Sequence, residues 1–314
     1  MQSELRSRTT LLRILGTGLA LVLLFYVLRQ QDWEDIAAAV VQIQPWRFVL
    51  ALGLMFGSRF FVIGRWHVLL RSGGVNANWK QSLRITFAGL FANNFLPTTV
   101  GGDVARLGGA LYMGFDAAVS AASLVVDRMV GLAGMALAIP IGLQRVVQDV
   151  GFQGTDLLTP LMVASGSWLD RWRVRLSSIV SRVFTALQRW ISQPLALLLS
   201  FGFTLLHMLC LFTAISVLLA GMGEPLPFLL IAGLWALVYL ISLLPFSINA
   251  LGLQEISVAY AFTQLGGVSA ANSVVLALLV RALFLLASLP GAFFLSEVLP
   301  GVAQARPLLR KLDS

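Results

Sequence analysis

The stretch NNFLPTTVGGDVAR, residues 93–106, interrupts a chain that is otherwise strongly apolar. It holds two amides, a proline, two threonines, two glycines, an aspartate and an arginine. Proline removes a backbone donor and glycine weakens a helix, so a helix that reaches this stretch must break within it. The reason for a polar, broken segment lies in the composition of the whole chain.

That composition is typical of an integral membrane protein. Of 314 residues, 58% are hydrophobic and 11% are charged, with a mean hydropathy of +0.86. A soluble domain has about a quarter charged residues. Runs long enough to cross a hydrocarbon core of about 30 Å as helices cover residues 11–28, 46–63, 117–143, 195–222, 226–246 and 272–298. Unbroken runs exclude a β-barrel, whose strands alternate, so we expect an all-α polytopic membrane protein.

The distribution of the basic residues fits a membrane protein and does not require a nucleic-acid partner. The net charge is +8, but the basic residues fall in short loops and at both termini, where the positive-inside rule explains them without nucleic acid. Basic residues near both ends predict cytoplasmic termini of a multi-pass protein in the cytoplasmic membrane. Cys210 is the single cysteine, and no metal, hydrolase or nucleotide motif occurs. We expect no cofactor, no metal and no catalytic residue.

Residues 168–191 differ in kind from the apolar runs. Apolar residues recur there at three- and four-residue steps, with arginines largely off that stripe. The pattern predicts an amphipathic helix in the cytoplasmic interface; the alternative is a core helix packed on its neighbours. Residues 153–169 before it are short for a span, and we expect a short or tilted return there.

An internal repeat links the two halves of the chain. At an offset of 153 residues, 114–132 lies over 267–285 without a gap, and Arg128 falls on Arg281. Small apolar residues match by chance in membrane helices, but arginines inside apolar helices do not match so easily.

The polar break repeats as well. FLPTTVGGDVAR corresponds to LLPFSINALGLQE, residues 243–255. The first break is approached from the basic loop 64–80, the second from residues 221–227, which hold no Lys or Arg and should lie outside. The two halves are therefore predicted to be inverted. The expected segments are 1–45, a first half 46–143, a connector 144–194, a second half 195–298 and a tail 299–314.

Broken helices at corresponding positions of an inverted repeat are typical of a transporter whose site lies between the halves. Non-helical backbone cannot face lipid and must be buried in protein or line a wet cavity. We therefore predict two re-entrant hairpins, 81–114 from inside and 226–266 from outside, whose tips meet.

The candidate site gathers polar residues at the breaks and ionisable residues in the flanking helices. Guanidinium groups and helix N-termini both bind phosphate. The residues expected to hold an anionic lipid headgroup are Asn93, Asn94, Thr99, Asp103, Arg106, Arg128, Ser247, Asn249, Glu255 and Arg281. The residues expected to break the helices are Pro97, Gly101, Gly102, Pro245 and Gly252. The candidates for proton coupling are Asp103, Asp127 and Glu255.

Each of these groups has a structural alternative. Two pairs would simply lock helices together: Asp127 with Arg128, and Asp103 with Arg106. Arg59 would extend toward the cytoplasmic interface, and Glu255 would stabilise a helix start. We expect His207, on an apolar helix, to be a packed core residue.

Four motifs carry a family resemblance. GRWHVLL (64–70), NNFLPTTVGGDVAR, SLVVDRMVGL (123–132) and LLPFSINALGLQE resemble, in order and spacing, the flippase-like membrane region of lysylphosphatidylglycerol synthases and related stand-alone proteins. The likeness covers residues 46–298. It implies movement of lipids, notably aminoacylated phosphatidylglycerol, between leaflets. The characteristic positions that it implies are Arg65, Pro97, Gly102, Asp103, Arg106, Asp127, Arg128, Gly252 and Glu255.

The sequence also departs from that family. It shows no soluble aminoacyl-transferase domain, so we expect no transfer of lysine from tRNA. The second break reads PFSINALG rather than a Pro-Gly-Gly-rich form, which leaves the substrate open.

Together these features predict a lipid flippase-like transporter, without ATP, for an anionic phosphate-bearing lipid such as a phospholipid or a polyprenyl-phosphate carrier. Its expected partners are membrane lipids and, in addition, a second copy of the chain or a lipid-modifying enzyme. Two alternatives stay open. One is a membrane glycosyltransferase that uses a polyprenyl-linked sugar, with the outer-loop acids Asp32, Glu34 and Asp35. The other is an accessory membrane subunit of a lipid-modifying enzyme.

Overall fold

The computed structural model describes residues 34, 41–95, 101–150, 190–243, 250–296 and 298, with the side chains of 147–150 left out. This part of the chain is almost entirely helical and contains no strand. Four of its helices are long and apolar enough to cross a membrane, which defines an all-α polytopic membrane protein. The predicted first helix at 11–28, the return at 153–169, nearly all of the amphipathic segment 168–191 and the C-terminal tail lie outside the described residues.

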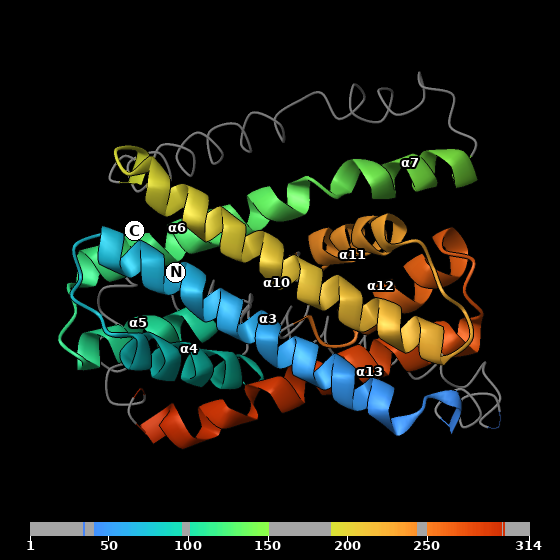
Figure 1. Ribbon diagram of the computed structural model, residues 1–314, viewed down its shortest axis with the longest axis horizontal. Helices are drawn as coiled ribbons and strands as arrows, with labels where there is room; N and C mark the ends of the chain where they lie inside the picture. The colour runs from blue at the N-terminus through green and yellow to red at the C-terminus, as the bar shows by residue number, and fades with distance from the viewer. Residues whose placement is uncertain are drawn as a thin grey trace, which may run out of the picture.

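Two long helices form the support of the molecule. Helices α3 (Pro45–Ser72) and α10 (Pro194–Gly221) each have 28 residues and begin with proline, which costs no hydrogen bond in a first helical turn. They lie side by side and run in opposite directions (Figure 1). The indole of Trp190 fixes this arrangement, because its Nε1 donates to the Leu69 carbonyl at 3.1 Å and so ties the start of α10 to the end of α3.

Helices α4 (Trp79–Asn93) and α5 (Gly101–Tyr112) flank the first predicted break. Asn78 starts α4 through a capping box, which satisfies two backbone donors that a helix start leaves open. The two helices approach closely at two glycines: a Cβ on Gly102 would lie 2.9 Å from the carbonyl oxygen of Gly89. Glycine at both positions therefore lets the two helices of this hairpin pack backbone to backbone.

The apolar run 117–143 forms two helices instead of the single helix expected from sequence. Helix α6 (Ala117–Ala136) and helix α7 (Ile139–Val150) are separated by two residues. Pro140 accounts for the division, because proline lacks the backbone donor that a continuous helix would need and fits only in the first turn of a new one.

The second half follows a similar order of elements. These are α11 (Phe228–Ser242), α12 (Leu253–Tyr260), the π-helix η2 (Ala261–Leu265), α13 (Ala270–Ser288) and the 3₁₀ helix η3 (Leu289–Phe294). The 15 residues of α11 reach about 22 Å at about 1.5 Å each, short of a hydrocarbon core of about 30 Å. The prediction that run 226–246 is long enough to span is therefore wrong for its helical part.

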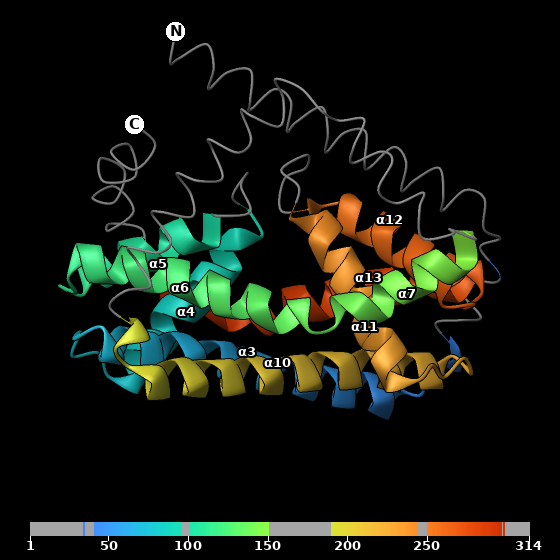
Figure 2. The same cartoon turned by 90° about the horizontal axis from the view of Figure 1, so that it is seen from above.

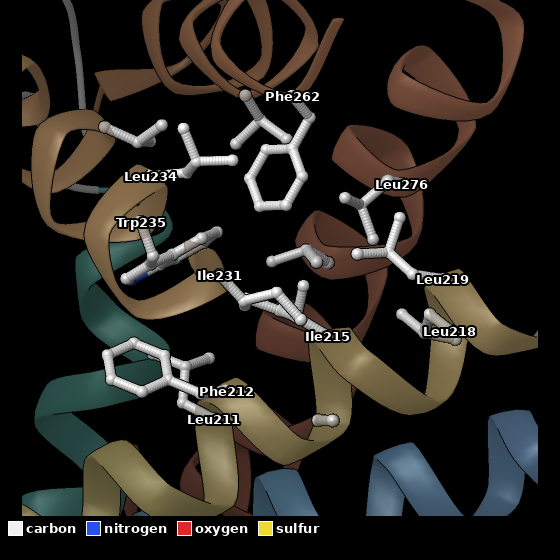
Figure 3. Packing of buried hydrophobic residues seen from close by; sticks show 14 of the residues in the cluster. Leu211, Phe212, Ile215, Leu218, Leu219, Ile231, Leu234, Trp235, Phe262 and Leu276 are labelled. Carbon is white, nitrogen blue, oxygen red and sulfur yellow. The ribbon is translucent and has the colours of Figure 1, made fainter. Parts of the chain in front are cut away.

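The two hairpins point toward each other. Helices α5 and α12 begin near the middle of the molecule and run outward in opposite directions (Figure 2). The largest described core cluster joins α10, α11, α12 and α13, and it includes Phe212, Ile215, Leu234, Phe262 and Leu276 (Figure 3). This core holds the second hairpin against the long helices.

The segment that follows α13 returns to the first hairpin. Helix η3 packs on α4, where Gly291 lies so close to the Phe87 carbonyl that a side chain would not fit. Val298 belongs to the same cluster as Ala88 and Ala105. The two predicted halves are therefore interlocked rather than separate bodies.

Candidate functional site

A cavity of about 290 Å³ lies where the two hairpins meet. The end of α4 lines it with Leu90, Asn93 and Asn94, and the end of α11 lines it with Tyr239 and Ser242. These helix ends directly precede the two polar breaks in the sequence, so the cavity lies beside the ends of both α4 and α11.

Three arginines from three helices line the cavity. Arg59 comes from α3, Arg128 from α6 and Arg281 from α13. The described lining residues include no aspartate or glutamate. The cavity is thus strongly cationic, and its walls also carry amide, hydroxyl and aromatic groups.

A chain of alternating charges leads from the first half of the protein to Arg128. Arg65 donates two hydrogen bonds to Asp127, from Nε to Oδ1 at 2.6 Å and from Nη2 to Oδ2 at 3.1 Å. Nη1 of Arg106 also contacts Asp127 Oδ2, at 3.0 Å, and lies 3.3 Å from Asp103 Oδ1. The second carboxylate oxygen of Asp103 accepts from Arg128 Nε. Thus Arg128 reaches the cavity with its charge partner fixed behind it.

Because these ion pairs are buried, removing any one of the charged groups is expected to destabilise the protein. Asp127 is only 2% exposed, and its two arginine partners are also buried. Removing one member of a buried ion pair costs more than the pair contributes, because a charge is left without a partner. The alternative pairing of Asp127 with Arg128 does not occur, since adjacent residues of a helix point about 100° apart. The alternative pairing of Asp103 with Arg106 does occur, as part of the larger network.

Glu255 serves the second half in two ways. Its Oε1 lies 3.0 Å from Arg281 Nε, and its Oε2 accepts from the backbone nitrogen of Gly252 at 2.7 Å. Gly252 has φ of +79°, a conformation that glycine adopts without the strain of other residues. The same carboxylate therefore starts α12 and neutralises a cavity arginine.

The structure brings only part of the predicted site to the cavity. Asn93 and Asn94 line it; Asn93 Oδ1 accepts from the Gly102 backbone at 3.1 Å, and Asn94 Nδ2 donates to Ser288 at 2.8 Å. Three predicted headgroup residues do not line the cavity: Asp103, Arg106 and Glu255. Asp103 and Glu255 bind the cavity arginines, whereas Arg106 binds the carboxylates of Asp103 and Asp127. Gly101 starts α5. The predicted residues outside the described part are Pro97, Thr99, Pro245, Ser247 and Asn249.

The cavity is also lined by residues outside the predicted headgroup set, among them Arg59, His207 and Tyr239. The guanidinium of Arg59 lies 4.9 Å from the centre of the Phe284 ring, inside the cavity wall and not at the interface suggested as its alternative position. His207, expected in the packed core, lines the cavity and has Nδ1 2.6 Å from Ser58 Oγ. Tyr239 adds a hydroxyl. An arginine flanked on both sides by apolar residues was the available signal for Arg59, but α3 lies outside the repeated segment that singled out Arg128 and Arg281.

Chemically, this arrangement suits an anion. Charge-assisted bonds from guanidinium groups to phosphate or carboxylate oxygens are among the stronger hydrogen bonds in proteins. Within the described part of the chain, no group of three or more His, Cys, Asp or Glu residues is placed to hold a metal ion.

The long apolar helices define the chain as a polytopic membrane protein, and its cavity is lined by three arginines. Its sequence matches the family described as lysylphosphatidylglycerol synthase TM region over residues 13–291. The chain belongs to this family, which confirms the resemblance and supports a lipid-related role in a membrane. No curated protein matches the chain.

Proposed function

We propose that the protein is a flippase-like transporter that moves an anionic, phosphate-bearing lipid between the leaflets of the cytoplasmic membrane. The observation that carries the proposal is the meeting of Arg128 and Arg281, at corresponding positions of the repeat, in one cavity between two broken-helix hairpins. Membership of a lipid-related membrane family supports it.

The arrangement of elements supports an inverted repeat. Helix α6 starts at residue 117 and α13 at residue 270, which matches the sequence offset of 153. The partners α3 and α10 have equal lengths and run antiparallel (Figure 1). In transporters of this type, the site lies between the repeats, at helices that are interrupted near the middle of the bilayer. We infer that both hairpins are re-entrant and enter from opposite sides.

The cavity is sized for a headgroup. A volume of about 290 Å³ is at the small end of ligand pockets, which span about 300–1,000 Å³. The arginines replace the water that a phosphate loses on entering the membrane, while the acyl or prenyl tails stay in the bilayer. Asp103 and Glu255 each bind a cavity arginine, so these two carboxylates are better placed than Asp127 to couple a proton to headgroup binding.

The test is movement of fluorescent phosphatidic acid and of fluorescent phosphatidylglycerol between leaflets of proteoliposomes that contain the purified protein. Arg128→Gln and Arg281→Gln should each slow the movement by about tenfold or more, because each removes a charge-assisted contact to the headgroup. Arg145→Gln is the matched control, since Arg145 is exposed on α7 and does not line the cavity.

Two results would contradict the proposal. Folded Arg128→Gln and Arg281→Gln proteins that move lipid at the normal rate would remove the cavity from the mechanism. Sugar transfer from a polyprenyl-linked donor, without lipid movement, would identify a glycosyltransferase instead, and neither activity would favour the accessory role.

A further inference from the structure

Two arginines of the cavity keep donors without an acceptor. Nε of Arg59 and Nη2 of Arg281 are buried, and neither has a hydrogen-bond partner among the described residues. Both side chains line the same cavity, and Phe284, which follows Arg281 by three residues on α13, lies under the Arg59 guanidinium. A buried donor without an acceptor is costly, so these two nitrogens indicate a ligand that supplies acceptors.

Arg59 differs from the other two cavity arginines in its charge environment. Arg128 contacts Asp103 and Arg281 contacts Glu255, whereas no carboxylate in the described part of the chain pairs with Arg59. The segments that connect the hairpin helices, 96–100 and 244–249, contain no charged residue in their sequence. Hence neither hairpin tip brings a carboxylate to Arg59.

The local charge count has a positive excess. Five arginines belong to the cavity and its ion-pair network: Arg59, Arg65, Arg106, Arg128 and Arg281. They face three carboxylates: Asp103, Asp127 and Glu255. In this part of the structure, the arginines of the cavity and its network outnumber the carboxylates by two. Uncompensated charge inside a membrane is costly, and the ligand that best offsets it carries two negative charges.

We propose that the cavity selects a terminal phosphate with two negative charges, such as a phosphate monoester or a diphosphate on a lipid, and that Arg59 recognises the second charge. This inference rests on the proposed function and narrows its substrate class. It favours a lipid phosphomonoester over a phosphodiester such as phosphatidylglycerol. It disfavours a lysylated headgroup, because all three nearby carboxylates already bind arginines and none is left for an ammonium group.

Ligand binding to the full-length protein in detergent tests the inference without transport. The probes are short-chain phosphatidic acid, short-chain phosphatidylglycerol and glycerol 3-phosphate, and the readout is the rise in unfolding temperature with ligand concentration. At a pH of about 8, a phosphate monoester with a second pKa of about 6 carries two charges. We expect the wild type to bind phosphatidic acid about tenfold more tightly than phosphatidylglycerol.

The variants locate that preference. Arg59→Gln should bring the ratio of the two affinities to about one, whereas Arg59→Lys should keep part of it because it keeps the charge. Arg145→Gln should leave the ratio unchanged. Equal affinities in the wild type, or an unchanged ratio in Arg59→Gln, would overturn the inference.

Two further outcomes distinguish this inference from binding of soluble phosphate esters and from the proposed transport. Glycerol 3-phosphate that binds as tightly as phosphatidic acid would overturn the lipid source and assign the site to soluble phosphate esters. Selective binding of phosphatidic acid by a protein that moves no lipid in proteoliposomes would support this inference while contradicting the proposed transport.

Discussion

At the scale of single residues, the decisive feature is how each buried charge is paired. Asp127 pairs with Arg65 and Arg106. Arg106 also pairs with Asp103, and Asp103 in turn pairs with Arg128. An isolated charge at this depth would be expensive, but a chain of alternating charges shares that cost among several contacts. The pairing therefore fixes Arg128 at the cavity while the acids stay behind it.

Asp127→Asn should destabilise the protein strongly. The change removes a carboxylate that binds two buried arginines, and breaking a buried ion pair costs about 3–5 kcal/mol. Thermal unfolding of the purified protein in detergent measures the loss. Asp116→Asn is the control on the same helix: Asp116 caps α6 at its exposed start, and asparagine caps as well as aspartate. Equal unfolding temperatures for the two variants would refute the importance of the network.

At the scale of elements, glycine contacts set how closely helices approach. Helix α7 packs on α11 where Gly142 and Gly233 meet backbone to backbone. This contact holds α11 against α7, the helix that follows α6. The end of α11 lines the cavity. The position of the second hairpin therefore depends on the absence of two side chains.

Gly233→Ala should lower the unfolding temperature in detergent. Its Cβ would lie 2.6 Å from the backbone nitrogen of Gly142, so the helices must separate, at a cost of about 1–3 kcal/mol. Gly202→Ala is the matched control in α10, where nothing lies within 4 Å of an added Cβ. Alanine there should be neutral or stabilising by about 0.5–1 kcal/mol. A stabilised Gly233→Ala protein would show that this contact is loose.

The apolar runs and the internal repeat of the sequence predicted several features at this scale. The apolar runs 46–63 and 195–222 predicted the long helices α3 and α10, and the repeat pointed to Arg128 and Arg281, which line one cavity. The division of run 117–143 was missed, although Pro140 was its signal. The partners of Asp127 were also missed. Pairing between side chains far apart in sequence depends on packing, and no local pattern encodes it.

At the scale of the whole molecule, the two hairpins are held by an antiparallel pair of long helices. The end of α3 leads to the first hairpin and the end of α10 to the second, at opposite ends of the structure (Figure 2). If these ends lie on opposite faces of the membrane, as we propose, the loops that enter the hairpins must face different compartments.

Labelling of single cysteines in cells with a membrane-impermeant maleimide tests this topology. On a Cys210→Ser background, Asn76→Cys should react only after the membrane is permeabilised, and Pro225→Cys should react in intact cells. Both positions are exposed, so access depends on the side of the membrane. Labelling of both cysteines in intact cells, or of neither, would rule out an inverted arrangement.

The contact between η3 and α4 has a consequence for biosynthesis. Asn94 and Ser288 bind each other across 194 residues of sequence, and Gly291 covers the backbone at Phe87. At about 5–20 residues per second, a ribosome needs about 10–40 s to extend the chain from one partner to the other. Throughout that interval the nascent first hairpin waits in the membrane without its cover. The first hairpin therefore acquires its cover only after α13 and η3 have been synthesised.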